Sequence, residues 1–213
     1  CRKAARRTAT PLREAATVVR NPGYVGKLPV LQKKKHARQQ GPGRWCDAIV
    51  FLSTTLDILN QEQQKNLIKF IQMGNGFVGI HAAADTEYDW PWYGKLVGAY
   101  FVSHPEGQPK ATIKTLNKNS IFTNHIENNW EIEDEWYNYQ FINPNITPIL
   151  NLDERSYEGG INGKNHPITW YHEFDGGRSF YTGLGHLEKT FEDERFKELL
   201  RKGILYAAGQ IKL

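Results

Sequence analysis

The chain has 213 residues, of which 39% are hydrophobic, enough for one well-filled core and too few for two comfortable domains. Its formal net charge of +4 is unevenly spread. Residues 1–45 hold 12 of the 27 basic residues and one of the 23 acidic residues, which leaves 15 basic and 22 acidic residues for the remainder. A basic extension on an acidic globule is therefore a better description than a uniformly basic protein.

The composition also bounds the setting of the protein. No apolar run approaches the roughly twenty residues that cross a bilayer, so we expect a soluble protein without a membrane partner. No apolar region follows the basic start, so we expect no signal peptide in this chain, and both cytoplasm and periplasm stay open. The two cysteines, Cys1 and Cys46, give neither a disulfide framework nor a metal-binding spacing.

Residues 1–45 have a composition of their own. Arg, Lys, Ala, Gln and Pro dominate, and apolar pairs such as Val18-Val19 show no sustained period. We interpret this segment as a basic extension that is disordered or aberrant, without a pattern that supplies a strand or a helix. A basic arm that contacts nucleic acid is the alternative interpretation.

Beyond this extension the pattern is that of an α/β domain. Ala48–Leu52 is a continuous apolar run, typical of a strand covered on both faces. Asn60 with Gln63 predicts a capping box at the start of a helix, and Gly74 predicts its end. A second apolar run ends at Ile80, so strand, helix and strand follow one another with short connections. This order predicts a right-handed crossover in a parallel sheet.

The rest of the chain supplies further strands and a final helix. Alternating or apolar runs predict strands over 111–116, 130–137, 148–152, 168–171 and 178–183, and a helix from about residue 192. We therefore expect one domain over 46–213 with a three-layer α/β/α architecture and a mostly parallel, flavodoxin-like sheet. Its first strand–helix unit is missing or degraded, because residues 1–45 carry no such pattern.

A histidine stands at the end of the second strand. Gly79-Ile80-His81-Ala82-Ala83 is similar in shape to the nucleophile elbow, in which a reactive side chain sits on a strained strand-to-helix turn. Ligands bind at the carboxyl ends of parallel strands, so His81 is placed for chemistry. The alternative is a histidine that merely ends a strand.

A second histidine, His186, also ends an apolar run and follows a glycine. We expect His81 and His186 to meet at adjacent strand ends, with His104 and Glu135 beside them. Such a set suits general acid–base catalysis or a divalent metal such as zinc, for which His81, His104, His186 and Glu135 are the candidate ligands. No H-x-x-x-H spacing supports the metal, so both interpretations stay open.

Aromatic residues are the other prominent feature. Aromatic faces beside carboxylates and imidazoles suit a sugar, whose apolar face stacks while its hydroxyls take hydrogen bonds. Each of these rings taken singly is as well explained by the core. The candidates for a sugar-binding surface are Trp90, Trp92, Tyr93, Trp136, Tyr137 and Trp170, with His104.

Several motifs together resemble the ThuA-like family, which is named for trehalose utilisation. They are Gly74 to Asp85, Trp90-Pro91-Trp92-Tyr93, Ser103-His104-Pro105, Asp134-Glu135-Trp136-Tyr137, Asn165-His166-Pro167-Ile168-Thr169-Trp170 and Tyr181-Thr182-Gly183-Leu184-Gly185-His186. They follow one another in order over about four-fifths of the chain. The resemblance implies the class I glutamine amidotransferase-like fold and a role in carbohydrate breakdown. ThuA-like chains open with a strand and a histidine-bearing loop, which residues 1–45 do not resemble.

The amidotransferases of this fold use a Cys–His–Glu triad. In this sequence His81 stands where their cysteine would be, while His186-Leu187-Glu188 keeps the later half of the triad. Without a thiolate no acyl intermediate forms, so we do not expect glutamine amidotransferase activity. We assign His81, His186, Glu188 and Glu135 as the catalytic candidates, with Glu188 orienting His186.

The resulting hypothesis is an enzyme that processes a disaccharide or its keto derivative by histidine acid–base or metal-assisted chemistry. The alternative is a carbohydrate-binding module of the same fold without catalysis. Nucleic-acid binding through residues 1–45 ranks last. The expected partner is a small-molecule sugar, and the sequence leaves open whether the chain forms a homo-oligomer.

Overall fold

The computed structural model describes residues 16–20 and 46–213. An eight-stranded sheet with the order β1-β2-β3-β10-β9-β8-β5-β6 forms its centre, and β4 and β7 form a separate two-stranded sheet. The strands are β1 Ala16–Arg20, β2 Ala48–Leu52, β3 Gly76–Ile80, β4 Tyr100–Ser103, β5 Lys110–Thr115, β6 Asn129–Glu133, β7 Asn138–Gln140, β8 Thr147–Asp153, β9 Pro167–Phe174 and β10 Gly177–Thr182. The α-helices are α1 Gln61–Gln72, α2 Pro91–Val97 and α3 Glu194–Ala207, and the 3₁₀ helices are η1 His81–Asp85, η2 Glu154–Ser156 and η3 Glu188–Glu192.

Most strands of the large sheet run in one direction. β1, β2, β3 and β10 pair in parallel, whereas β9 is antiparallel to both β10 and β8, and β5 to both β8 and β6. Only β9 and β5 of these described strands therefore run against the other six. The predicted mostly parallel α/β sheet is confirmed, with the antiparallel pairs gathered in its second half.

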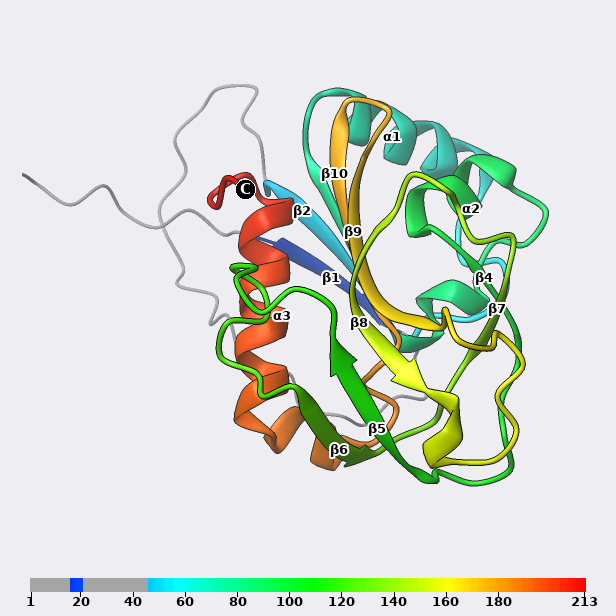
Figure 1. Ribbon diagram of the computed structural model, residues 1–213. Coiled ribbons are helices and arrows are strands. Elements are labelled where there is room, and N and C mark those ends of the chain that lie inside the picture. Colours follow the sequence, from blue (N-terminus) through cyan, green and yellow to red (C-terminus); the bar gives the residue numbers. More distant parts are fainter. Residues whose placement is uncertain (1–15, 21–45) are drawn as a thin grey trace, which may run out of the picture.

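Helices cover both faces of the sheet (Figure 1). On β10, the Ser179 hydroxyl donates to the Leu96 carbonyl of α2, while the neighbouring Phe180 lies against Gly203 of α3. Successive strand residues point to opposite faces, so α2 and α3 lie on opposite sides of β10. Gly177, on the same face as Ser179, lies against Ile71 of α1. The expected three layers are therefore present.

Close packing requires glycine in two of these contacts. A Cβ on Gly203 would lie 2.4 Å from the Phe180 ring, and one on Gly76 would lie 2.1 Å from the Ala207 carbonyl oxygen. Phe180 is fully buried between the sheet and α3. Burial of such a ring contributes about 2–3 kcal/mol, so this contact is a substantial part of what holds α3 on the sheet.

The crossover β2–α1–β3 forms as its local signals predict. Asn60 accepts the backbone N–H of Gln63, and the Gln63 side chain accepts the backbone N–H of Asn60. Met73 caps the other end of α1, and Gly74 follows with φ at +85°. β2 and β3 then pair in parallel.

One strand lies inside the segment interpreted as a disordered or aberrant extension. Ala16–Arg20 forms β1, which pairs in parallel with β2 from Ala16 opposite Ala48 to Arg20 opposite Leu52. The prediction that residues 1–45 supply no strand is therefore wrong for these five residues. A five-residue strand needs no sustained period, and Thr17-Val18-Val19 is β-branched throughout. Residues 1–15 and 21–45 lie outside the described residues.

The hairpin between β9 and β10 turns through Asp175 and Gly176, both with positive φ. The strand expected over 130–137 is shorter, since β6 ends at Glu133 and β7 begins at Asn138. The four residues between them, 134–137, leave the sheet and carry Glu135 into the site described below.

Among the described helices, none combines the length and apolar character of a membrane-crossing segment.

Candidate functional site

The site is built on the turn at the end of β3. His81 follows Ile80 directly and has φ at +49°, a conformation that is uncommon for residues other than glycine. The Tyr181 hydroxyl donates to the His81 carbonyl at 2.7 Å, which fixes this strained turn. A Cβ on Gly79 would lie 2.9 Å from the Tyr181 ring and 3.2 Å from the Ala83 side chain. The small residues around His81 therefore let the turn pack tightly, as the elbow-like pattern predicts.

The imidazole of His81 is held at both nitrogens. Its Nδ1 lies 2.9 Å from the Gly183 carbonyl oxygen at the end of β10, and its Nε2 lies 3.1 Å from Glu135 Oε2. The ring packs on Tyr137, with 4.3 Å between ring centroids, and only 2% of the residue is exposed. Because a carbonyl oxygen can only accept, Nδ1 carries a proton and donates it to Gly183.

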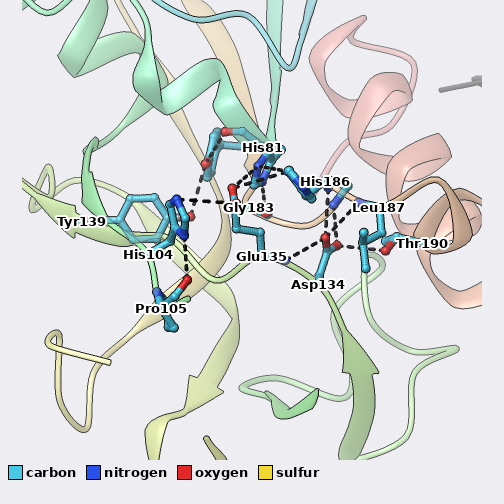
Figure 2. Close-up of polar contacts among 12 residues, drawn as sticks. His81, His104, Pro105, Asp134, Glu135, Tyr139, Gly183, His186, Leu187 and Thr190 are labelled. Carbon is cyan, nitrogen blue, oxygen red and sulfur yellow. Dashed lines mark hydrogen bonds and ion pairs between the residues drawn. The ribbon is translucent and has the colours of Figure 1, made fainter. Parts of the chain in front are cut away.

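Glu135 reaches the site because of its neighbour Asp134. Asp134 Oδ1 accepts the backbone N–H groups of Glu135, His186 and Leu187, at 3.0–3.1 Å. Its Oδ2 accepts from the Gly185 N–H at 2.8 Å and the Thr190 hydroxyl at 2.9 Å (Figure 2). One fully buried carboxylate thus joins the segment after β6 to the loop after β10. It determines where Glu135 and His186 stand relative to each other.

Two further imidazoles complete the cluster. His186 Nδ1 lies 3.2 Å from His81 Nε2 and 3.4 Å from Glu135 Oε2. His104 Nε2 lies 3.6 Å from Glu135 Oε1, while its Nδ1 lies 2.7 Å from the Pro105 carbonyl oxygen. The side chains of His186 and His104 are 37% and 41% exposed, whereas Glu135 is 11% exposed. The cluster therefore has a buried half and a half that solutes can reach.

The surroundings hold Glu135 charged and His186 neutral. Burial raises the pKa of Glu135, but the hydrogen bond from His81 and the neighbouring imidazoles outweigh it and lower the pKa below its ordinary value. Burial, and then the proximity of His81, lower the pKa of His186. Near pH 7 the site therefore presents a carboxylate and the lone pair of at least one imidazole.

The predicted site residues fall into three groups. His81 and His186, which follow β3 and β10, lie together as expected, and Glu135, His104 and Tyr137 join them from the segments after β6 and β4. Figure 2 shows His81 and His186 next to each other near Glu135, and their rings meet edge to face with 5.0 Å between centroids. Tyr137 forms the apolar wall behind His81 and packs on Phe101, with 4.2 Å between ring centroids.

Glu188 does not lie where the triad pattern places it. It begins η3 with an exposed side chain, and the ring of His186 contacts His81 and Glu135 instead. The loop after His186 turns away because the Leu187 N–H is bound to Asp134. The role of orienting His186, expected for Glu188, therefore passes to Asp134 and Glu135.

The other predicted sugar-binding aromatics lie in the core or elsewhere. Tyr93, Trp136 and Trp170 are fully buried, and their polar atoms donate to the carbonyls of Ala83, Pro109 and Val97 respectively. Their faces are therefore closed to a ligand, and the core interpretation replaces the sugar-binding one.

Trp90 and Trp92 stack on each other, with 5.0 Å between centroids. Trp92 donates to Asp175 in the turn that precedes β10. Asp175 precedes the amino end of β10, whereas His81 follows the carboxyl end of its parallel neighbour β3. The tryptophan pair therefore lies at the opposite end of the strands from His81.

Two acids that are not among the candidates from the sequence contribute to the site. The oxygens of Asp134 are occupied by backbone and Thr190 donors. Burial raises the pKa of Asp85, and the nearby His81 and Glu135 also act on this pKa through their charges. The Tyr88 hydroxyl donates to Asp85 at 2.6 Å. The only signal for Asp85 was its position at the end of the elbow motif.

The cluster has the donor types of a metal centre. Within residues 16–20 and 46–213, His81, Glu135 and His186 are the one group of three whose possible ligand atoms all lie within 4.8 Å of one another. The same groups are able to move protons, since imidazoles and carboxylates are the usual acid–base side chains. The geometry alone is compatible with either chemistry.

Comparisons with known proteins agree with this architecture. The ThuA family, described as trehalose utilisation, matches residues 44–207 and supports a carbohydrate-related role. No curated protein sequence matches the chain. Among solved structures, a ThuA-like protein from Bacteroides uniformis has a TM-score of 0.64 at 21% identity, covering 76% of this chain and 69% of that one. A ThuA-like protein from Parabacteroides merdae has a TM-score of 0.64 at 20% identity, covering 79% and 73%.

A β-galactosidase from Bacillus circulans also resembles the chain, with a TM-score of 0.55 at 10% identity. The match covers 78% of this chain and 23% of the β-galactosidase. At identities this low, the structural matches establish the fold alone.

Proposed function

The chain belongs to the ThuA family of trehalose utilisation, and we propose that it is an enzyme that processes a disaccharide or its keto derivative at the His81–Glu135–His186 cluster. The observation that carries the proposal is the convergence of three imidazoles on one carboxylate at the carboxyl end of the sheet. Ligands of α/β proteins bind at this edge, and perturbed titratable groups concentrate in active sites.

The two halves of the cluster have different tasks. His81 and Glu135 are buried and fixed, so they hold the geometry, while His104 and His186 are half-exposed and meet the substrate. Tyr137 is buried between His81 and Phe101, and the partly exposed Phe101 offers an apolar ring near these polar groups. A sugar presents both an apolar face and hydroxyls, so this combination supports a carbohydrate substrate.

A keto sugar suits such a site for a chemical reason. A ketone acidifies the carbon between itself and the anomeric carbon, and an imidazole accepts that proton. The electron pair forms a carbon–carbon double bond, the bond to the glycosidic oxygen breaks, and this oxygen leaves with a proton. The step needs one base, one acid and no oxidant or reductant, and His104 and His186 are the two groups within reach of a substrate.

The test is turnover of trehalose and of its keto derivative by the full chain, with products followed by mass spectrometry. We expect the keto derivative to be cleaved, and we expect His186→Ala and Glu135→Gln each to abolish cleavage while the proteins stay folded. Glu188→Gln is the matched control and should retain activity, because its side chain is exposed and apart from the cluster. Sugar binding without product in the wild type would favour the carbohydrate-binding module instead.

A further inference from the structure

The three atoms at the centre of the cluster form a triangle of nearly equal sides. His81 Nε2 and Glu135 Oε2 are 3.1 Å apart, His81 Nε2 and His186 Nδ1 are 3.2 Å apart, and His186 Nδ1 and Glu135 Oε2 are 3.4 Å apart. Ligand atoms bound at about 2.0–2.1 Å to a tetrahedral zinc ion are about 3.3–3.4 Å apart. In a six-coordinate ion with bonds of similar length, adjacent ligand atoms are about 3.0 Å apart. The edges of 3.1–3.4 Å lie between these two spacings, so the triangle is of the size that a bound transition-metal ion occupies.

A proton and a metal ion are alternatives at His81 Nε2. His81 Nδ1 carries the proton that goes to the Gly183 carbonyl, so once Nε2 gives up the proton that it shares with Glu135, its lone pair points into the triangle. His104 repeats this arrangement, because its Nδ1 faces the Pro105 carbonyl and its Nε2 faces Glu135. A single cation at the centre of the triangle would take the place of such a proton and contact all three ligand atoms at once.

The supporting contacts are those of a metal site. A metal-binding histidine usually donates its other ring N–H to a carbonyl or carboxylate, and His81 does so to Gly183. Glu135 is held from behind by its backbone bond to Asp134 and is flanked by His104 at its second oxygen. Two imidazoles and one carboxylate leave a fourth position for water or substrate, as catalytic zinc sites do.

We propose that His81 Nε2, His186 Nδ1 and Glu135 Oε2 bind one divalent transition-metal ion, zinc in the first place, with the fourth position on the half-exposed side. Imidazole nitrogens favour zinc over magnesium or calcium, which prefer oxygen ligands. When bound, the ion would act as a Lewis acid on a substrate oxygen and so replace His186 as the acid of the elimination, while His104 would remain the imidazole that accepts the proton. The proposal deepens the proposed function, because it concerns the same cluster, but zinc binding does not depend on which sugar is processed.

The experiment is a titration of chelator-stripped full-length protein with zinc chloride by calorimetry, with metal content measured by elemental analysis. We expect one zinc per chain, and cobalt(II) in its place should give the intense visible absorption of a four-coordinate site. Glu135→Gln and His186→Ala should each weaken zinc binding at least 100-fold. Glu133→Gln is a matched control two residues away, where an exposed carboxylate pairs with Lys189, and its affinity should equal that of wild type.

Each other outcome overturns the proposal. Absence of one-to-one binding, or equal affinity in Glu135→Gln and Glu133→Gln with both folded by circular dichroism, means that the triangle holds protons rather than a metal. Tighter binding of iron(II) or manganese(II) than of zinc overturns the assignment of zinc. Turnover of the keto sugar separates the two proposals. A protein that binds zinc but gives no product keeps the metal site and loses the sugar chemistry. A protein that cleaves the keto sugar but binds no zinc keeps the sugar chemistry and loses the metal site.

Discussion

Two buried histidine–glutamate pairs of this protein share one local chemistry and differ in their surroundings. His81 lies between the Gly183 carbonyl and Glu135, and His166 lies between the Tyr137 carbonyl and Glu154. In both pairs one ring nitrogen faces a carbonyl and the other a carboxylate. The first pair continues into the half-exposed His186 and His104, while the second is closed by the Tyr157 hydroxyl at 3.5 Å and the Asn162 N–H at 2.8 Å.

The closed pair works as a structural clasp. Glu154 begins η2, and His166 directly precedes β9, so the pair joins the two ends of the loop between β8 and β9. His166 also ties this loop to the Tyr137 carbonyl, and the Tyr137 ring packs on His81. Both ring nitrogens of His166 have partners, and the His166 side chain has no exposed surface. A histidine–glutamate pair therefore marks a site only where further donors and an opening accompany it.

The largest expected effect breaks this clasp. Glu154→Ala takes the carboxylate from His166 Nδ1, whose pKa burial lowers, and a buried polar group that loses its hydrogen bond costs about 1–3 kcal/mol. We expect the free energy of unfolding in urea to fall by about 2 kcal/mol. Glu135→Gln, the equivalent change in the open pair, should cost clearly less stability and abolish turnover. The reverse ranking of the two variants would contradict the comparison.

The second prediction tests what positions the open pair. In Asp134→Asn an NH₂ group replaces one oxygen and meets backbone or Thr190 donors, so at least one contact that orders the loop before His186 is lost. Supporting contacts of this kind are worth about 10–100-fold in metal affinity, and we expect a loss in that range by zinc titration.

A control separates this positioning role from general stability. Asp193 accepts the Arg195 N–H at the start of α3, so Asp193→Asn also weakens a backbone-binding carboxylate, but one that makes no contact with the cluster. Asparagine still caps the helix, so the variant loses mainly the ion pair with Arg195; it should lower the unfolding free energy by about 0.5 kcal/mol and leave zinc affinity unchanged. Equal zinc affinity in Asp134→Asn and wild type would mean that Asp134 does not position the ligands.

The fold was predictable where its signals are local. A few neighbouring residues are enough to predict the start of α1, from the capping box of Asn60 and Gln63, and the strand β2, from the apolar run Ala48–Leu52. The strained backbone turn at His81 could also be predicted, because the glycine and alanines around it form an elbow-like pattern. β1 was missed because a five-residue edge strand depends on its pairing with β2 and carries little pattern of its own.

The composition of the site was predictable only in part. Two histidines at the ends of neighbouring parallel strands meet by topology, so His81 and His186 could be paired from sequence. Which aromatic rings face a ligand depends on packing between distant segments, and Trp170 lies in the core beneath α2 for that reason. The displacement of Glu188 depends on Asp134 binding the loop that precedes it, a long-range contact without a local signature.

The third prediction concerns His172, a buried histidine without a carboxylate partner among the described residues, and so isolates the effect of burial on a histidine pKa from the effect of an ion-pair partner. His172 donates from Nε2 to the Lys95 carbonyl at 2.9 Å, and burial lowers its pKa from the ordinary value of 6.5. The unfolded chain then binds a proton more readily than the folded protein below pH 6.5. The contribution to stability is therefore complete above pH 6.5 and falls as the pH drops toward the folded pKa, by up to about 1.4 kcal/mol per pH unit.

His172→Gln should remove this part of the pH dependence, because glutamine does not titrate and still offers an N–H to Lys95. We expect its unfolding free energy to fall less steeply than that of wild type between pH 7 and pH 5, measured by urea titration. His125→Gln is the control, since His125 is only partly buried and its lowered pKa should matter less. A steeper fall in the His172 variant than in wild type would contradict the assigned direction.

The variant with the smallest expected effect tests whether zinc affinity and turnover at His81 and Glu135 depend on the overall stability of the protein. Asn60→Ala removes the acceptor for the Gln63 N–H at the start of α1, which costs about 1 kcal/mol. Its helix packs on the sheet away from the cluster, so we expect lower stability in urea with zinc affinity and turnover unchanged. If zinc affinity fell in parallel with stability in this variant, the losses expected for Asp134→Asn would report on general unfolding rather than on position. Unchanged affinity leaves geometry around Glu135 and His186 as the cause.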